Sequence, residues 1–582
     1  MTESNRRHPT PYSSRSLADD DLIAPRWHPK RSACVMAVVT LAFVGLIARA
    51  GWVQIVEHEF HVAQGEKRHR QMLALEAKRG PIVDRHGALL AVSLTTYEIW
   101  AEPKRIDPAA VEPLAKALAL SPTQLRERLD SARTHALLKR HVDSQTATRI
   151  ADLGVAGITQ VASSERFYPE GESAAHVVGL TDVDDVGQEG VELAANELLT
   201  GEPGEREVIR DRLGRVVSDL RPLVPAHPGQ TVRLTIDRRI QQLAFAQLKA
   251  ALERHRAQAG SVVVLDARTG EILALANAPS FDPNARAGLT PNTMRNRAVV
   301  DTFEPGSTIK PLAIATALDA GKVHPGTLVD TAPGRYRIGP NTIHDTSNHG
   351  TVSVAQALAT SSNIALAKIA LTLPAETLWR AYRQYGIGLA PPLPFPGAAA
   401  GKLRPWERWR PVEQATMGYG YGLSTSLLQM AQAYTALAGD GTLRPVALIA
   451  QEENAAPAST SATGAARATT ESSAAALRTM LEAATLAGGT GRAAHVEGYR
   501  VGGKTGTAWK HAGTGYAKNR YRSLFVGIAP IDAPRLIVAV MIDDPTSRSY
   551  YGGAVAGPVF SAVAGGALQL LGVPPSAPAP DA

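Results

Sequence analysis

One uncharged stretch near the N-terminus constrains the fold of this chain more than any other feature. Residues 32–47 (SACVMAVVTLAFVGLI) carry no charge, and apolar residues resume after Arg49 and continue to Val56. A helix needs roughly 20 apolar residues to cross a bilayer, and residues 32–56 reach that length. Arg49 lies close enough to one end to extend to the interface, where Trp52 also fits. We expect a single N-terminal transmembrane helix at residues 32–56.

The charges before this stretch predict its orientation. The positive-inside rule keeps a basic N-terminal tail, residues 1–31, in the cytoplasm and places the rest of the chain on the other side. Two alternatives are a cleaved signal peptide, because residues 48–50 read Ala-Arg-Ala, and a core helix of a cytosolic protein. The long charged tail and the interfacial Arg-Ala-Gly-Trp segment favour an anchor. The basic residues of the tail are Arg6, Arg7, Arg15, Arg26, Lys30 and Arg31.

Composition excludes several classes of protein. The single cysteine, Cys34, can form neither an intramolecular disulfide nor a cysteine-rich metal site. The net charge of +7 is small for 582 residues, and no basic run with interleaved aromatics indicates a nucleic-acid partner. Contact with anionic lipid or an acidic polymer explains the charge equally well.

Beyond the anchor, the sequence changes in texture near residue 229. Residues 57–228 are charged and rich in glycine, with short strand-like runs and helical pieces within 108–129. We expect an extended α+β region there, called the pedestal below, and a second domain over residues 229–573. Residues 455–475 and a disordered tail, 574–582, are expected to be mobile, because they contain too few large apolar side chains to repay ordering.

Strand-like segments at both ends of the second domain predict an α+β fold. A helix with one apolar stripe is expected to begin near Asp237, and two apolar runs within 261–276 form an antiparallel hairpin. A second hairpin occupies 522–542, and long helical stretches lie between the two. We expect an antiparallel sheet flanked by helices and built from both ends of the domain, with the last helix, at 560–571, packed on it.

The first stretch with catalytic potential is Ser307-Thr308-Ile309-Lys310, which is expected to open a helix. Residues three apart on a helix share a face, so the amine of Lys310 can reach the hydroxyl of Ser307. A serine becomes a good nucleophile when a base takes its proton, and lysine is such a base if burial or nearby cations lower its pKa. Free N–H groups at the helix N-terminus can stabilise an oxyanion beside the serine. Alone, this motif also arises by chance.

Two later stretches add polar groups of the right kind. Residues 361–363 (Ser-Ser-Asn) offer a hydroxyl for proton relay and an amide that can hold a peptide-like substrate. In residues 502–508 (GGKTGTA), the glycines permit close approach of a backbone or substrate, and the lysine and threonines suit a carboxylate. Taken singly, the first is also compatible with an ordinary turn and the second with a glycine-rich turn before a strand.

In this order, S-x-x-K, S-x-N and K-T-G form the signature of penicillin-binding proteins and serine β-lactamases, which this chain resembles. Upstream, residues 79–87 (RGPIVDRHG), 166–169 (RFYP) and 187–192 (GQEGVE) resemble the non-catalytic domain of class B penicillin-binding proteins. A β-lactamase lacks that module. The run from Leu198 to Arg215 is most similar to the division-specific, FtsI-type members. The resemblance covers nearly the whole chain and implies a penicillin-binding, β-lactamase-like transpeptidase domain.

The resemblance implies a role for each motif residue. Ser307 attacks the carbonyl between the terminal D-alanines of a peptidoglycan stem peptide, with Lys310 as its base. Ser361 passes a proton to the leaving amine with help from Lys504, and Asn363 holds the donor amide. The residues implied to face the substrate carboxylate or the oxyanion are Lys504, Thr505, Gly506 and Thr507, with the backbone N–H groups of Ser307 and Thr507 forming the oxyanion hole.

The family further implies that an amine of a neighbouring stem peptide resolves the acyl-enzyme, and that β-lactams acylate Ser307. No cofactor or metal is implied, and His344, Asp345 and His349 are interpreted as a loop near the cleft rather than a metal site. Class A β-lactamases place an asparagine four residues after a catalytic glutamate. The candidate glutamates, each lacking that asparagine, are Glu376, Glu407 and Glu413, so fast β-lactam hydrolysis is not expected.

Three hypotheses about biological role remain. The first is a transpeptidase for septal cell wall, anchored in the cytoplasmic membrane of a bacterium with its catalytic domain in the periplasm. The second is a transpeptidase of side-wall elongation, and the third is mainly a scaffold of a division complex. The resemblance implies a membrane glycosyltransferase partner of the FtsW type and other division proteins.

Overall fold

The predicted apolar segment is helical. The computed structural model describes residues 29–576, except 58, 61–69, 76, 133, 211–215, 394, 396, 451–466, 513 and 514. Helix α1 (Pro29–Gly51) continues into a π-helical turn, η1 (Trp52–Val56). Together they are long and apolar enough to cross a membrane, and no side chain of α1 is buried. An N-terminal helix suited to anchoring is therefore present, as the sequence predicts.

A small antiparallel sheet belongs with this N-terminal segment. Residues up to Leu75 and Gly204–Pro225 form one unit, and the rest of the chain forms a second. The sheet of the first unit has the order β1-β6-β7. Its strands are β1 (Arg70–Leu75), β6 (Gly204–Arg210) and β7 (Val216–Val224).

The N-terminal part of the second unit is a strand-and-helix layer, as expected for the pedestal. Its sheet has the order β4-β3-β2-β8, with β5 paired to β3. Three short helices bury Leu114, Leu125 and Ile150 against the strand residues Ile99 and Leu138. The strands are β2 (Ile82–Val83), β3 (Leu89–Ala101), β4 (Ala136–Val142), β5 (Ile158–Phe167) and β8 (Val232–Arg233), and the helices are α3 (Val111–Ala117), α4 (Pro122–Asp130) and α5 (Ser144–Asp152).

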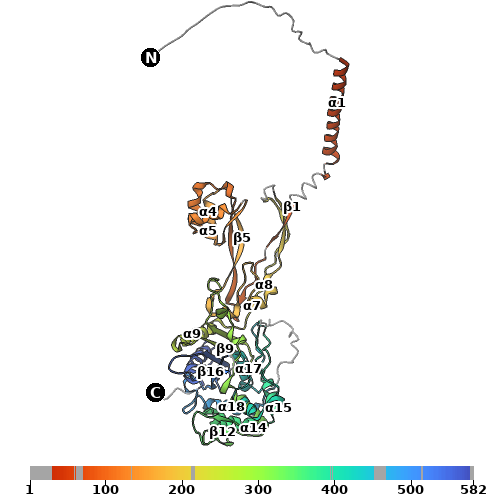
Figure 1. Cartoon of the computed structure of the whole chain (residues 1–582). Coiled ribbons are helices and arrows are strands. Elements are labelled where there is room, and N and C mark those ends of the chain that lie inside the picture. The colour runs from red at the N-terminus through yellow and green to blue at the C-terminus, as the bar shows by residue number, and fades with distance from the viewer. Residues whose placement is uncertain are drawn as a thin grey trace, which may run out of the picture. The chain divides into compact units, whose positions relative to one another are not determined.

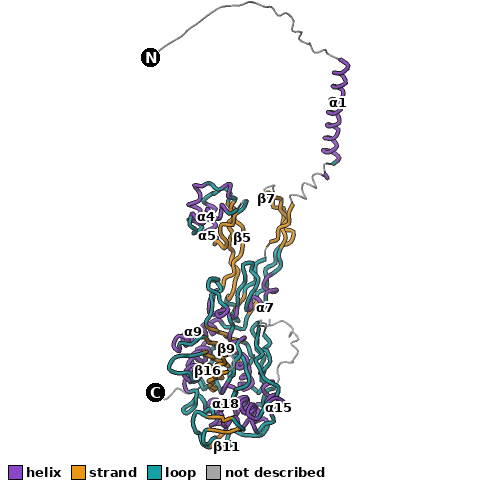
Figure 2. Tube along the Cα trace, viewed as in Figure 1, coloured by secondary structure: helices purple, strands orange, loops and turns teal. Residues whose placement is uncertain are grey.

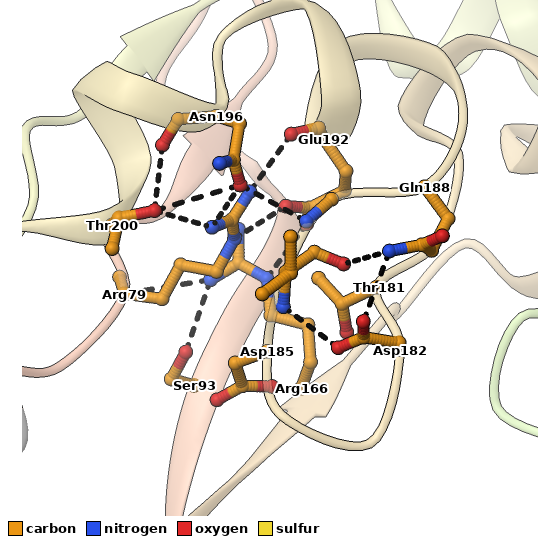
Figure 3. A network of polar contacts seen from close by, with 12 residues as sticks. Arg79, Ser93, Arg166, Thr181, Asp182, Asp185, Gln188, Glu192, Asn196 and Thr200 are labelled. Carbon is orange, nitrogen blue, oxygen red and sulfur yellow. Dashed lines mark hydrogen bonds and ion pairs between the residues drawn. The ribbon is translucent and has the colours of Figure 1, made fainter.

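A buried ion-pair network joins the three motifs that the sequence analysis found in this region (Figure 3). The carboxylate of Glu192, in α7 (Gly190–Ala194), accepts hydrogen bonds at 2.7 Å from the Nε atoms of Arg79 and Arg166. Arg79 also donates to Asn196 Oδ1 at 2.9 Å, in α8 (Asn196–Thr200). Removing one member of such a group leaves a buried charge uncompensated, so the three motifs fix the local backbone together.

The first motif also holds the start of the second predicted domain. One oxygen of the Asp84 carboxylate accepts the backbone N–H groups of His86 and Ala88, both at 2.8 Å. The other accepts the N–H of Arg238 at 3.2 Å, the first residue of α9 (Arg238–His255). Asp237 caps this helix by accepting the N–H of Arg239, so the predicted helix start near Asp237 is confirmed.

The central sheet is antiparallel and is built from both ends of the domain, as predicted. Its strand order is β10-β9-β17-β16-β15, and two of these strands, β9 and β16, are labelled in Figure 1. Most residues of β9, β10 and β17 are buried on both faces, which explains their continuous apolar sequences. The strands are β9 (Ala259–Asp266), β10 (Ile272–Ala278), β15 (Gly502–Ala512), β16 (Gly515–Ala529) and β17 (Leu536–Asp543).

Helices cover both faces of this sheet (Figure 2). On one face, α9 and α20 (Gly557–Leu570) share a core that includes Phe525 and Phe560. On the other, α17 (Leu427–Ala438) lies against the strands and contacts α18, and further helices pack on α18 and on one another. These helices include α12 (Lys310–Asp319), α13 (Val354–Ala359), α14 (Asn363–Leu371), α15 (Ala375–Gln384), α16 (Pro411–Met417) and α18 (Glu471–Ala483).

The prediction that residues 455–475 are mobile is wrong for their last part. Thr470 caps α18 by accepting the N–H of Ser473, and Ala474 in its first turn is completely buried. The Asp319 carboxylate accepts hydrogen bonds from the hydroxyls of Thr469 and Thr470. Small side chains therefore pack here instead of leaving the chain unordered. Residues 455–466 and 577–582 lie outside the described residues.

Candidate active site

Ser307 lies on a helical turn that is held in place by hydrogen bonds with two other segments. The turn η5 (Gly306–Ile309) leads directly into α12, so the prediction of a helix beginning near Ser307 is confirmed. The buried hydroxyl of Tyr434 donates to the carbonyl oxygen of Thr308 at 2.7 Å. Gly306, at φ +52°, donates its N–H to the carbonyl of Gly420 at 3.1 Å. A Cβ on Gly420 would lie 2.0 Å from the Gly306 oxygen, so the glycine-rich segment 418–422 is a close-fitting support for the serine.

Lys310 is fully buried and begins α12, three residues after Ser307. Its ammonium donates to the carbonyl oxygen of Ser361 at 2.6 Å, to Ser361 Oγ at 3.1 Å and to Asn363 Oδ1 at 2.8 Å. Burial and the nearby charge of Lys504 lower its pKa well below 10.5, while Asp345 opposes that shift. The lowered pKa favours the neutral amine that a general base requires.

Ser361 lies on the turn between α13 and α14, and Asn363 is the first residue of α14. Ser361 has φ of 63°, in the left-handed region that costs a residue with a side chain about 1–2 kcal/mol. The carboxylate of Asp345 supports this turn: it accepts the Ser362 hydroxyl at 2.6 Å and the N–H groups of Asn363 and Ile364. This role of Asp345 was not predicted, since no spacing pattern links it to the motif.

The third motif lies within an edge strand, β15, rather than in a turn before it. Lys504 is fully buried, and burial lowers its pKa to about 7. The hydroxyl of Thr505 is hydrogen bonded to that of Thr490 at 2.9 Å, and Thr507 Oγ1 accepts the N–H of Gly552 at 3.0 Å. Both threonine side chains are thereby oriented along the strand.

Gly506 brings this strand against the serine turn. A Cβ at Gly506 would lie 2.9 Å from Thr308 Cγ2 and 3.1 Å from both the Pro305 oxygen and Leu524 Cβ. Two of those atoms belong to the segment that carries Ser307. Glycine is therefore required for the strand to approach the nucleophile this closely.

All three motifs meet at one cavity of about 460 Å³. Ser307, Ser361, Asn363, Thr505 and Thr507 line it, and Lys310 and Lys504 are buried beneath it. The structure thus brings together the residues that the sequence motifs singled out. Lining residues that sequence reasoning missed are Thr346, Thr360, Thr490, Tyr551, Gly552 and Gly553.

This arrangement can support acyl transfer. The Ser307 hydroxyl lies in the first turn of a helix, where backbone N–H groups have no intrahelical partner. Buried amines with lowered pKa values can accept and return its proton, and hydroxyls along an edge strand can bind a carboxylate or an extended peptide.

Comparison with known proteins agrees with the geometry. Residues 260–565 match the family model of the penicillin binding protein transpeptidase domain, and residues 74–234 match that of the penicillin-binding protein dimerisation domain. The probable peptidoglycan D,D-transpeptidase PenA of Neisseria meningitidis is 42% identical over 97% of both chains. The peptidoglycan D,D-transpeptidase FtsI of Escherichia coli K12 is 36% identical over 94% of this chain and 93% of its own.

Solved structures give the same result. The transpeptidase domain of penicillin-binding protein 3 from Burkholderia pseudomallei is 46% identical and superimposes with a TM-score of 0.54, covering 59% of this chain and 98% of that domain. A peptidoglycan synthetase from Bifidobacterium adolescentis, 27% identical, has a TM-score of 0.68 and covers 88% of this chain and 99% of its own. Together with the two domain matches and the full-length relatives, these findings establish that the chain belongs to the class B penicillin-binding proteins, in the group of the FtsI and PenA transpeptidases.

Proposed function

We propose that this protein is a serine D,D-transpeptidase that cross-links peptidoglycan stem peptides through an acyl-enzyme on Ser307. One observation carries the proposal: Ser307 lines a cavity together with Ser361 and Asn363, both of which accept hydrogen bonds from Lys310, a fully buried lysine with a lowered pKa. Relatives that span almost the whole chain are named for the same activity.

In the proposed first step, the Ser307 oxygen attacks the carbonyl between the two terminal D-alanines. Its proton passes to Lys310, and the N–H groups of Ser307 and Thr507 stabilise the oxyanion. The C–N bond then breaks, and Ser361 hands a proton to the departing D-alanine amine. The hydrogen bond between Lys310 Nζ and Ser361 Oγ, at 3.1 Å, supports this relay.

In the second step, an amine of a neighbouring stem peptide attacks the ester. That amine loses a proton to the same relay, the ester C–O bond breaks, and Ser307 recovers its hydroxyl.

The other motif residues bind the donor peptide before it reacts. Asn363 holds the donor amide, while Lys504, Thr505 and Thr507 bind the substrate carboxylate. Gly506 contributes by letting this strand lie against the nucleophile.

We also propose the cellular setting. The helix at residues 29–56 anchors the protein in the cytoplasmic membrane, with the tail inside and both the pedestal (57–228) and the transpeptidase domain (229–573) outside. The relationship to FtsI supports septal synthesis, with an FtsW-type glycosyltransferase and other division proteins as partners. A tagged copy should localise at the division site; uniform side-wall localisation would indicate elongation instead.

The catalytic assignment is tested by intact mass after incubating the full-length protein, in detergent, with benzylpenicillin. The parent should gain one penicillin that persists for hours, whereas Ser307→Ala should gain none. Ser347→Ala, a change in a nearby exposed serine, is the matched control and should acylate like the parent. An adduct lost within seconds would identify a hydrolase, and an adduct on Ser307→Ala would exclude Ser307 as nucleophile.

A further inference from the structure

A second, strongly polar cavity lies at one end of the central sheet. Its volume is about 700 Å³, and it is lined by the ends of β9, β15 and β17 and by the segment around α11 (Arg297–Val300). Its lining shares no residue with that of the active-site cavity. The catalytic mechanism above uses none of its side chains.

The lining contains four cations and two carboxylates. Lys510 and Arg522 both pair with Asp543, at 2.7 and 3.2 Å, and Arg295 pairs with Asp301. The two carboxylates are therefore already shared among three cations.

Arg297 is the fourth cation, and its position is unusual. It is only 5% exposed, and among the described residues no carboxylate lies within 4 Å of its guanidinium. Its hydrogen bonds go to neutral acceptors, Asn292 Oδ1 at 2.5 Å and the carbonyl of Arg295 at 3.3 Å. A buried cation is costly without a nearby anion, and arginine stays protonated in proteins. Asp301 and Asp543 attract Arg297 only from a distance, and both are paired with other cations, so an anionic group entering the cavity would give Arg297 a direct counter-charge.

The cavity also lies within reach of a substrate held at Ser307. Lys510 follows Thr507 by three residues in β15, which corresponds to about 10 Å along an extended strand. On the opposite side, Asp301 and Thr302 lead directly into the segment that carries Ser307. The guanidinium of Arg522 lies 5.9 Å from the ring centre of Phe303, in the same segment.

We propose that this cavity is an anion subsite that binds a side-chain or terminal carboxylate of a peptidoglycan stem peptide, away from the bond that reacts at Ser307. The inference rests on the proposed function, because that function supplies a peptide polymer with acidic residues as substrate. Arg297 is the central binding group, and Arg295, Lys510 and Arg522 surround it. The subsite would select strands whose carboxylates are free over strands in which they are amidated.

The test measures binding to the full-length protein in detergent after acylation by benzylpenicillin, so that the reacting site is filled. The probe is a soluble disaccharide-tripeptide with free carboxylates, titrated by calorimetry at low salt. Arg297→Gln should weaken binding about tenfold, and Asp301→Asn should tighten it, because the lining then loses a competing carboxylate. Arg535→Gln is the matched control: this arginine also pairs with an aspartate, Asp266 at 3.1 Å, but lies at the far end of the sheet.

The opposite signs expected for Arg297→Gln and Asp301→Asn separate binding from mere structural damage. If Arg297→Gln does not fold, the half-exposed Arg295→Gln replaces it in the same comparison. The proposal is overturned if the same disaccharide-tripeptide with amidated carboxylates, or inorganic phosphate, binds as tightly as the probe with free carboxylates. It is also overturned if neither substitution changes the affinity for that probe. If benzylpenicillin forms no adduct, the proposed function fails separately, and the same titration on the unacylated protein still tests the subsite.

Discussion

Replacing Gly506 by alanine should impair acylation at Ser307 more than it destabilises the domain. The new methyl would lie 2.9 Å from Thr308 Cγ2 and 3.1 Å from the Pro305 oxygen, about 0.5 Å inside ordinary contact distance. Because both atoms belong to the segment that carries Ser307, the strand and the nucleophile must separate by a similar amount. A displacement of about 1 Å can cost roughly 100-fold in rate, so a shift of half that size should cost about tenfold.

The assay is the second-order rate of acylation by a fluorescent penicillin, measured beside thermal unfolding. Overpacking of this kind costs about 1–3 kcal/mol, so the variant should remain folded. Gly515→Ala is the control, because a Cβ at that strand position meets nothing within 4 Å. The reasoning is refuted if Gly506→Ala acylates within twofold of the parent, or if the control loses as much activity.

Three other predictions follow from buried charges. Burial lowers the pKa of Lys504 from an ordinary 10.5 to about 7 in the folded protein. Between pH 7 and pH 10.5, the unfolded chain therefore binds a proton at this lysine that the folded protein does not. The free energy of unfolding should therefore rise from pH 7 to pH 9, and urea midpoints for Lys504→Met should show a smaller rise. Asp345→Asn removes one acceptor from the turn of Ser361, and the acylation rate should fall about tenfold with little change in melting temperature; an unchanged rate would contradict this. Glu192→Gln leaves two buried guanidinium groups poorly compensated and should lower stability by about 3–5 kcal/mol in urea unfolding, while the acylation rate of the folded variant stays within twofold.

The central sheet could be predicted because its signals are local. Strands such as β9 and β17 are buried on both faces, so their apolar runs are continuous, and β9–β10 and β16–β17 are joined by short turns. The sheet β1-β6-β7 was not predicted, because it pairs Arg70–Leu75 with Gly204–Arg210. Nothing in either segment alone indicates its partner.

The site was predictable to the extent that its residues occur in short motifs. Ser307 and Lys310 are one helical turn apart, and Lys504 and Thr507 share a strand, but each motif alone was ambiguous, and only the order of all three predicted a site. Asp345 has no such spacing, because it reaches the turn of Ser361 through a separate loop. Thr490 and Tyr551 reach the cavity only through tertiary packing.

The predicted mobile segment, residues 455–475, was too long at its C-terminal end, and its composition is the reason. Residues 470–475 share their Ala, Ser and Thr content with the stretch before them, yet they form the cap and first turn of α18. The large apolar residues that hold this helix, Leu477, Met480 and Leu481, come later in the sequence.

The strand order of the central sheet has a consequence for how the protein is made. β9 pairs with β17, and Val263 lies opposite Ala539, so a strand synthesised early waits for one made almost 280 residues later. Until β17 is made, the edge of β9 that pairs with it has no partner and can pair with other chains. A protein that crosses a membrane unfolded would need its extreme C-terminal part on the far side before this sheet could close. Truncation shortly before β17 would therefore disable the candidate site, although Ser307, about 230 residues earlier, is still intact.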